Sequence, residues 1–278
     1  MLFYRLLRRL VEKSKNFCQI DLYLDLLCTI IVNRTCIGGS VNNYNSREWP
    51  RFAVTADTVA FAMVDKELSV LLIERRDDPY AGRWALPGGF VDAGETSSAA
   101  AARELFEECG LNISQERFTQ LASFGSPERD PRMRVVGVAY LLLLGTCEGV
   151  SAGDDAKRAV WRPLSEIKDG DLAFDHAEIL ATAKARLATL VTCHGAGVEL
   201  LSAPFTIGDL RRVCEQALDH SFEPANFRRR VLGEQGYLEP TGAKRGGRGN
   251  GADLYSGQRK LFALPLVRVE MSVEKEEV

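Results

Sequence analysis

Three glutamates lie at a spacing that would place them on one side of a helix. In TSSAAAARELFEECG, residues 96–110, they are Glu104, Glu107 and Glu108. At about 100° per residue, side chains three and four positions apart share a helical face. Like charges on one face repel each other, whereas a hard divalent cation such as Mg²⁺ or Mn²⁺ takes carboxylate oxygens together with substrate phosphates. The spacing therefore predicts a metal site for phosphate chemistry.

The residues around these glutamates make a solvated acidic helix face a poor explanation. The whole pattern is Gly89, five residues, Glu95, seven residues, and then Arg103-Glu104-Leu105-x-Glu107-Glu108-x-Gly110-Leu111. With each fixed residue at about 5–7% of average usage, seven fixed positions match by chance on the order of 10⁻⁸ per start. The arginine next to the glutamates can pair with a carboxylate and hold its orientation.

This segment resembles the Nudix box, G-x5-E-x7-R-E-U-x-E-E-x-G-U with U an aliphatic residue, at every position. The resemblance implies a mixed sheet sandwiched by helices, with the box as a loop–helix–loop that binds Mg²⁺. It also implies hydrolysis of a nucleoside diphosphate that is linked to another group. By position, it assigns catalysis and metal binding to Glu104, Glu107 and Glu108. It gives Arg103 a catalytic role in orienting them and places the backbone of Gly89 close to the metal.

The implied reaction agrees with the residue types. A diphosphate carries dense negative charge, and metal ions neutralise the charge that develops on its oxygens and acidify the attacking water. One further carboxylate can take the proton of that water. Members of the family differ in which glutamate acts as this base, so the base is left unassigned.

The sequence on either side of the box narrows the substrate. RRDDPYAGRWALPGGFVDAGE (75–95) and SPERDPRMRVVGVAYL (126–141) resemble the ADP-ribose-directed branch of the family. Pro127 lies sixteen residues beyond Leu111, where a proline marks ADP-ribose pyrophosphatases. The resemblance therefore implies ADP-ribose, or a related nucleotide, as the ligand.

Arginines suit the phosphates of such a ligand, and aromatic side chains can stack on its adenine. The expected substrate-binding residues are Arg76, Arg83, Trp84, Gly88, Phe90 and Arg129. For Trp84, a core position beside the sheet is an equal alternative. Asp175 and His176 are interpreted as the N-cap of a helix over 175–191 and its neighbour.

Hydrophobic periodicity predicts an α/β first domain over residues 51–192. We expect strands at 54–64, 68–76, 118–125, 135–145 and 158–167, and helices at 96–110 and 175–191. The segment HGAGVELLSAP is interpreted as part of a linker over residues 193–204.

Residues 205–265 have no part in a hydrolase and show the outline of a small winged helix-turn-helix domain. One helix is expected over 206–218, capped by Thr206, and a second over 224–236, which Pro224 opens and Gly236 closes. Two strands with a basic loop between them follow and would form the wing. The second helix is expected to be the recognition helix.

Local charge favours double-stranded DNA as a partner of this second domain. Residues 225–250 hold six cationic side chains and two glutamates, a net charge of +4 in a chain of net charge −3. Recognition helices bring arginines to base edges and phosphates, and wings reach the backbone. The expected DNA contacts are Asn226, Arg228, Arg229, Arg230, Lys244, Arg245 and Arg248. A basic face on an oligomerisation domain is the alternative.

The combination resembles the NAD-related Nudix transcriptional regulators. The matching residues of the second domain are Phe205, Thr206, Leu210, Asn226 to Arg230, Gly236, Leu238, Thr241, Gly242, Leu254 and Tyr255. The resemblance implies a homodimeric repressor of NAD-metabolism genes whose Nudix domain senses ADP-ribose. Many such regulators carry a damaged box, whereas this box is complete, so hydrolysis of the effector is expected as well.

Two other functions stay open at this point. One is a Mg²⁺-dependent ADP-ribose pyrophosphatase that releases AMP and ribose 5-phosphate and whose second domain only dimerises the protein. The other is a Nudix hydrolase of the housecleaning or NADH type.

The ends of the chain and its cysteines give little further direction. Residues 1–50 are interpreted as an N-terminal extension without a role in the chemistry, and residues 266–278 as an acidic tail. The apolar run 22–32 is too short for a membrane span and contains Asp25. Seven scattered cysteines without a C-x-x-C pair are typical of reduced thiols in a cytoplasmic protein.

Overall fold

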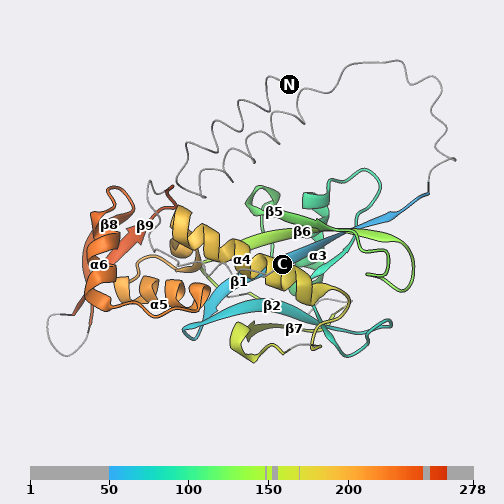
Figure 1. Ribbon diagram of the computed structural model, residues 1–278, viewed down its shortest axis with the longest axis horizontal. Helices are drawn as coiled ribbons and strands as arrows, with labels where there is room; N and C mark the ends of the chain where they lie inside the picture. The colour runs from blue at the N-terminus through green and yellow to red at the C-terminus, as the bar shows by residue number, and fades with distance from the viewer. Residues whose placement is uncertain (1–49, 148, 152–155, 169, 247–250, 262–278) are drawn as a thin grey trace, which may run out of the picture. The chain divides into compact units, whose positions relative to one another are not determined.

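The computed structural model describes residues 50–147, 149–151, 156–168, 170–246 and 251–261 (Figure 1). Residues 1–49 of the expected extension, Arg248 in the basic loop and the expected acidic tail 266–278 lie outside the described residues. Within the described residues, no helix is long and apolar enough to cross a membrane.

A seven-stranded mixed sheet forms the centre of the first domain. Its strands are β1 (Ala53–Val64), β2 (Glu67–Arg75), β3 (Trp84–Ala85), β4 (Gly88–Phe90), β5 (Thr119–Phe124), β6 (Val135–Leu144) and β7 (Ala156–Pro163). Their order is β3-β2-β1-β6-β5, with β4 paired to β1 and β7 paired to β2. Strands β1 and β6 are parallel, and the other pairs in this sheet are antiparallel. The expected mixed sheet is confirmed.

Side chains alternate along the central strands and so point to both faces of the sheet. Each face is buried in its own hydrophobic cluster. In β1, Val59 and Phe61 belong to one hydrophobic cluster, whereas Ala60 belongs to another. Helix α4 (His176–His194) packs in the first cluster and helix α3 (Ser97–Cys109) in the second. Figure 1 shows these two helices on opposite faces of the sheet, as the Nudix resemblance implied.

Local signals set both ends of α3, the helix that carries the glutamates. The hydroxyl of Thr96 accepts a hydrogen bond of 3.2 Å from the backbone N–H of Ala99. Gly110 ends the helix with a φ of 74°, a left-handed conformation that glycine adopts without steric cost. The helix expected over 96–110 is confirmed.

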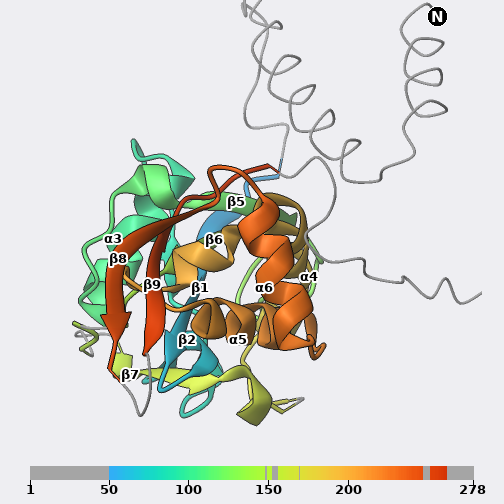
Figure 2. The same cartoon turned by 90° about the vertical axis from the view of Figure 1, so that its left-hand side faces the viewer.

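The second domain contains helices α5 (Ile207–Leu218) and α6 (Pro224–Gly233), followed by the antiparallel strands β8 (Leu238–Arg245) and β9 (Ala252–Gly257). Figure 2 shows both helices beside this hairpin. Thr206 caps α5 as expected, in a reciprocal capping box with Asp209. Helix α6 ends at Gly233, earlier than expected, because Glu234 is already extended with a ψ of 99°; Gly236 adopts a left-handed φ of 74° in the turn that leads to β8.

The segment expected to be a linker is folded against the core. Helix α4 continues to His194, and a short 3₁₀ helix, η4 (Ala196–Leu200), follows it. Val198 and Leu200 are buried in the same hydrophobic cluster as α4 and α5. The segment connects the two domains, but it is not a free tether; the domain boundaries themselves stay a prediction.

A side chain of α5 attaches the second domain to the first. The Oε1 atom of Gln216 accepts a hydrogen bond of 2.6 Å from the backbone N–H of Leu68, and its Nε2 donates one of 2.7 Å to the carbonyl of Lys66. Both partners lie at the turn between β1 and β2. The amide group thus satisfies a donor and an acceptor of the sheet edge at once.

Candidate active site and DNA-binding surface

Two adjacent glycines allow β4 to pass between β1 and the glutamate helix. In the β1–β4 pair, Gly88 lies opposite Asp57 and Gly89 opposite Ala56. A Cβ atom at Gly88 would lie 2.5 Å from the carbonyl oxygen of Ala56, and one at Gly89 would overlap the carboxylate of Glu104. A side chain at Gly88 would thus meet backbone, whereas one at Gly89 would displace the flexible side chain of Glu104, so glycine allows close approach at both positions.

Arg103 gathers the carboxylates of the box around one guanidinium. Its Nη1 donates hydrogen bonds of 2.8 Å to Glu104 and 2.9 Å to Glu107. Its Nη2 donates to Glu95 at 2.8 Å and to the carbonyl of Phe90 at 3.0 Å. The hydrogen bond from Arg103 lowers the pKa of Glu95, and bonds to carboxylates raise the pKa of Arg103. This arrangement agrees with the orienting role expected for Arg103.

Glu104 and Glu108 lie deeper than Glu107. Burial raises the pKa of Glu108 to about 8, and the negative charge of Glu104 contributes in the same direction. The backbone N–H of Gly88 donates a hydrogen bond of 2.8 Å to Glu108 and opposes this shift. Burial also raises the pKa of Glu104. Two partly desolvated carboxylates near each other are unfavourable without a cation between or beside them.

The donor set fits a hard divalent cation in its chemistry. The carboxylates of Glu104 and Glu108, whose pKa values burial raises, are suitable oxygen ligands. Gly89 has no side chain and leaves space beside the carboxylate of Glu104. Among the described residues, however, no three acidic, histidine or cysteine side chains converge as a ready metal site. The hydrogen bonds from Arg103 use one oxygen of Glu104 and one of Glu107, and the second oxygen of each carboxylate can still ligate a cation.

A small cavity of about 50 Å³ opens beside the glycine turn. Its walls come from β1, β2, β4, the loop before β6 and the start of α4. They are formed by Thr55, Asp57, Ile73, Arg75, Leu86, Gly88, Gly89, Phe90, Arg129, Asp130, Arg132, Phe174 and His176. Of the expected site residues, Gly88, Gly89, Phe90 and Arg129 line this cavity. A nucleotide needs more room than this volume offers, so side chains must move for it to enter.

Arginine and aromatic side chains alternate along one wall of the cavity. The guanidinium of Arg75 lies 4.8 Å from the ring centre of Phe174. The guanidinium of Arg132 lies 5.5 Å from the ring centre of Phe90 and 5.7 Å from that of Phe174. Such a wall offers both cations for a diphosphate and flat surfaces for a base.

The structure places the other expected substrate-binding residues outside this cavity. Arg76 is exposed, and exposed Arg83 donates a hydrogen bond of 2.6 Å to the carbonyl of Gly170. Trp84 is half-buried beside the core, with the guanidinium groups of Arg158 and Arg162 near its ring. For Trp84 this is the core alternative; the ligand contacts of these residues stay a prediction.

Sequence reasoning missed Arg75, Arg132 and Phe174. Strand parity identifies the first of these, because Ile73 and Arg75 are two positions apart in β2 and line the same cavity, whereas Arg76 follows on the other side. Arg132 and Phe174 lie in loops, where no periodic pattern indicates direction.

Arg129 is buried and is bound to acidic partners within the protein. Its Nε donates a hydrogen bond of 2.8 Å to Asp175, and its Nη2 lies 3.3 Å from Asp57. Its Nη1 donates to the hydroxyl of Thr55 at 3.1 Å. A Cβ at Gly137 would lie 2.7 Å from Nη2, so this glycine leaves the space for the guanidinium.

Asp175 occupies the N-cap position of α4, as expected, with His176 as the first residue of the helix. The Asp175 side chain makes no capping hydrogen bond, however, and binds Arg129 instead. His176 is buried, and its Nδ1 accepts a hydrogen bond of 2.9 Å from the backbone N–H of Leu86. Burial lowers the pKa of His176, so its imidazole is neutral at pH 7. The first turn of α4 is thus tied to the cavity wall.

Three of the cations expected to bind DNA are paired with acids of the winged helix. Arg228 lies 3.6 Å from Asp253, and Lys244 lies 3.7 Å from the same carboxylate. Arg245 forms a 2.7 Å ion pair with Asp209. All three cations are exposed enough to exchange these partners for phosphate oxygens.

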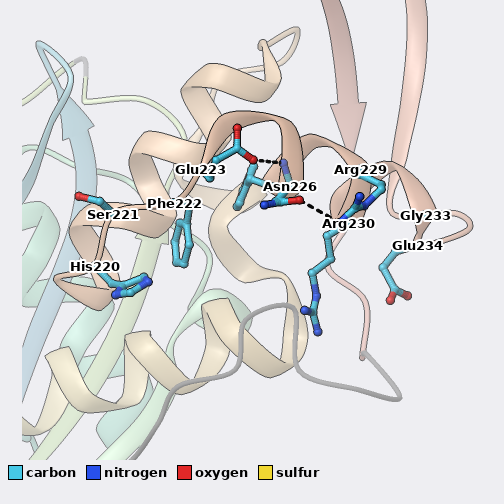
Figure 3. A pocket seen from close by; sticks show the side chains of 10 residues that line it. His220, Ser221, Phe222, Glu223, Asn226, Arg229, Arg230, Gly233 and Glu234 are labelled. Carbon is cyan, nitrogen blue, oxygen red and sulfur yellow. Dashed lines mark hydrogen bonds between the residues drawn. The ribbon is translucent and has the colours of Figure 1, made fainter.

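Asn226 and Arg229 lie together on α6. The Nη2 atom of Arg229 donates a hydrogen bond of 2.8 Å to Oδ1 of Asn226. Both residues line a groove of about 700 Å³ that also includes Arg230 and runs from His220 to Glu234 (Figure 3). Of the expected DNA-binding residues, these three thus border one concave surface.

The chain matches two protein-family models. Residues 54–183 match the NUDIX domain, and residues 197–256 match the NrtR DNA-binding winged helix domain. The chain is also 41% identical over 118 residues to an ADP-ribose pyrophosphatase of Methanocaldococcus jannaschii, across 42% of this chain and 67% of that protein.

Relatives with both domains are similar over most of the chain. The ADPR responsive transcriptional repressor NtrR of Acinetobacter baylyi is 34% identical over 71% of this chain and 79% of its own length. Shewanella oneidensis NrtR, in a crystal structure with a 27mer DNA, superposes with a TM-score of 0.66 and 32% identity, covering 76% of this chain and 98% of that one. The chain therefore belongs to the family of NrtR-type regulators, in which a NUDIX domain is followed by an NrtR winged helix domain.

Proposed function

We propose that this protein is an ADP-ribose-responsive transcriptional repressor of NAD-metabolism genes. The observation that carries the proposal is the outward-facing Asn226–Arg229 pair on helix α6 of a winged helix, joined without a free tether to a NUDIX domain with a cationic, aromatic cavity. Similarity to the NtrR repressor and to the NrtR–DNA complex extends through both domains and supports this assignment.

ADP-ribose suits the chemistry of the NUDIX cavity. Arg75 and Arg132 supply positive charge for its diphosphate, and Phe90 and Phe174 supply ring faces for its adenine. A repressor acts where the DNA is, so we place the protein in the cytoplasm. We also propose a homodimer, since a two-fold protein matches paired half-sites in DNA.

Fluorescence anisotropy of a labelled duplex from the gene's own upstream region tests the regulator. The protein is titrated without and then with ADP-ribose. Tight binding that ADP-ribose weakens is the expected result, and the affinity should fall steeply with salt because cations meet phosphates. Absence of binding to this duplex and to a random pool of duplexes would exclude the proposal.

A second activity at the same site is favoured by the complete box. We propose Mg²⁺-dependent hydrolysis of ADP-ribose to AMP and ribose 5-phosphate, which the similarity to an ADP-ribose pyrophosphatase also supports. Bound Mg²⁺ or Mn²⁺ would neutralise the diphosphate and acidify the attacking water. The metal ion would be held by Glu104, Glu107 and Glu108, and Arg103 would fix the orientation of these glutamates. Release of AMP that depends on Mg²⁺ is the test, and its absence would leave a sensor without turnover.

A further inference from the structure

The outward side of helix α6 carries one pair of hydrogen-bonding side chains. Phe227 and Val231 are buried and define the inward side of the helix. At about 100° per residue, Arg229 lies on the opposite side and Asn226 beside it. Because Arg229 donates a hydrogen bond of 2.8 Å to Asn226, the two side chains are held together before any ligand is present.

Small neighbours let this side of the helix come close to a partner. Ala225 and Gly233 flank the pair on the same outward side, and neither has a side chain beyond Cβ. No atom lies within 4 Å of the position that a Cβ at Gly233 would take. The groove drawn in Figure 3 continues this open surface toward Phe222. A slim helix surface of this kind fits the major groove of B-DNA, which is about 12 Å wide.

Three other cations of the domain differ because acids already bind them. Arg228 and Lys244 share Asp253, and Arg245 binds Asp209 at the start of α5. Arg228 also lies within 3.4 Å of the hydroxyl of Tyr255, so it is turned toward strand β9 and not outward. Lys244 and Arg245 lie at the end of β8 next to the loop of the wing, where they can meet phosphates that flank the groove.

Resting on the proposed DNA-binding function, we propose that Asn226 and Arg229 are the pair that determines the DNA sequence, whereas Arg228, Lys244 and Arg245 only position the protein on phosphates. The fork of an arginine matches O6 and N7 of guanine, and the amide of an asparagine matches N6 and N7 of adenine. Three helical residues span about 4.5 Å along the axis, close to the step of about 3.4 Å between base pairs. The bound site therefore contains a guanine and an adenine at neighbouring steps.

The experiment enriches binding sites from a pool of duplexes with randomised cores. The full chain is compared with Arg229→Lys and Asn226→Ala, and Arg228→Lys is the matched control. A lysine keeps the charge for phosphates but loses the planar fork, so Arg229→Lys tests recognition apart from attraction. All three side chains are exposed, and unchanged thermal midpoints verify that the variants fold.

The wild-type chain should enrich a motif with neighbouring guanine and adenine. For Arg229→Lys we expect about a 10-fold or larger loss of affinity for a duplex of that motif, with affinity for a shuffled duplex nearly unchanged. Asn226→Ala should lose the preference for adenine, and Arg228→Lys should keep the motif. Retention of the motif by Arg229→Lys, or its loss in Arg228→Lys, would overturn the assignment while leaving DNA binding intact. A wild-type chain that binds no duplex would overturn the proposed function as well.

Discussion

The hydroxyl of Tyr237 donates a hydrogen bond of 3.1 Å to the carbonyl oxygen of Gly195. Gly195 ends helix α4, and Tyr237 lies between α6 and β8 of the winged helix. Burial raises the pKa of Tyr237, so the hydroxyl keeps its proton and donates at neutral pH. At the other end of α4, about 28 Å away at 1.5 Å per residue, Asp175 binds Arg129 in the cavity wall. One helix thus connects the cavity to the winged helix.

Replacement of Tyr237 by phenylalanine should weaken the effect of ADP-ribose on DNA binding. It should change the affinity for ADP-ribose alone, or for DNA alone, less. The change removes the hydrogen bond to Gly195 and lowers the free energy of unfolding by about 1 kcal/mol. A movement of α4 on ligand binding would then be transmitted less firmly, and allosteric coupling free energies are typically only about 1–3 kcal/mol. We expect the ratio of DNA affinities without and with saturating ADP-ribose, measured by anisotropy, to approach one.

A matched control is Tyr140→Phe, since the Tyr140 hydroxyl bonds Ser97 at 2.7 Å inside the NUDIX domain. This variant should lose similar stability but keep the wild-type ratio of DNA affinities. If both variants responded alike to ADP-ribose, the contact between Tyr237 and Gly195 would have no special part in coupling.

Arg75 and Arg76 should differ sharply in their effect on nucleotide binding. Arg75 lines the cavity and lies over the ring of Phe174, whereas Arg76 is exposed outside it. Loss of a charged hydrogen bond costs about 1.5–3 kcal/mol, so Arg75→Met should weaken ADP-ribose binding about 10-fold or more. Arg76→Met is the control and should bind as the wild type does. Calorimetric titration of ADP-ribose into each variant measures these affinities. A larger loss of affinity in Arg76→Met than in Arg75→Met would support the expectation from the sequence that Arg76 binds the nucleotide.

Gly89→Ala should weaken metal binding while leaving the fold intact. The added Cβ would overlap the carboxylate of Glu104 and displace it from its position. Changes that reorient a metal-binding group typically cost 10- to 100-fold in affinity. Gly125→Ala is the matched control, since no atom lies within 4 Å of a Cβ there and no left-handed φ is involved. Titration with Mn²⁺ should separate the two variants; equal affinities would contradict the expected place of Gly89 at the metal.

The elements that follow local rules were predictable from the sequence. Helix α3 begins at a capping threonine and ends at a left-handed glycine, and both signals are visible in TSSAAAARELFEECG. The strands β1 and β2 follow from β-branched, apolar runs on either side of a turn. The three glutamates of α3 were assigned to a metal because their spacing places them on one side of one helix, and their binding of a metal stays a prediction.

Features that depend on distant contacts were missed. Asp175 has the sequence context of a helix cap, yet Arg129 binds it from a loop far away in the chain. The HGAGVELLSAP segment has the glycines of a tether, but Val198 and Leu200 find apolar partners on two helices and become core. In both cases tertiary contacts override a local preference, which a single sequence does not reveal.

Glu108 should make the metal-free protein less stable as pH rises. Burial raises its pKa in the folded protein to about 8, from 4.5 in the unfolded chain. Below pH 4.5 both states hold the proton; between these values the unfolded chain releases it and the folded protein does not. The free energy of unfolding therefore falls as pH increases, by up to about 1.4 kcal/mol per pH unit.

Glu108→Gln should remove this pH dependence and also abolish turnover. Glutamine has no carboxyl proton to lose, and its oxygen can still accept the hydrogen bond from Gly88. Chemical denaturation between pH 5 and pH 9 measures the difference between the two proteins, in which contributions of other groups, such as buried His176, cancel. Mg²⁺ should restore the stability of the wild type at high pH, because the cation favours the ionised carboxylate, and should not affect the variant. Parallel pH curves for the two proteins would show that Glu108 is not the buried acid that limits stability.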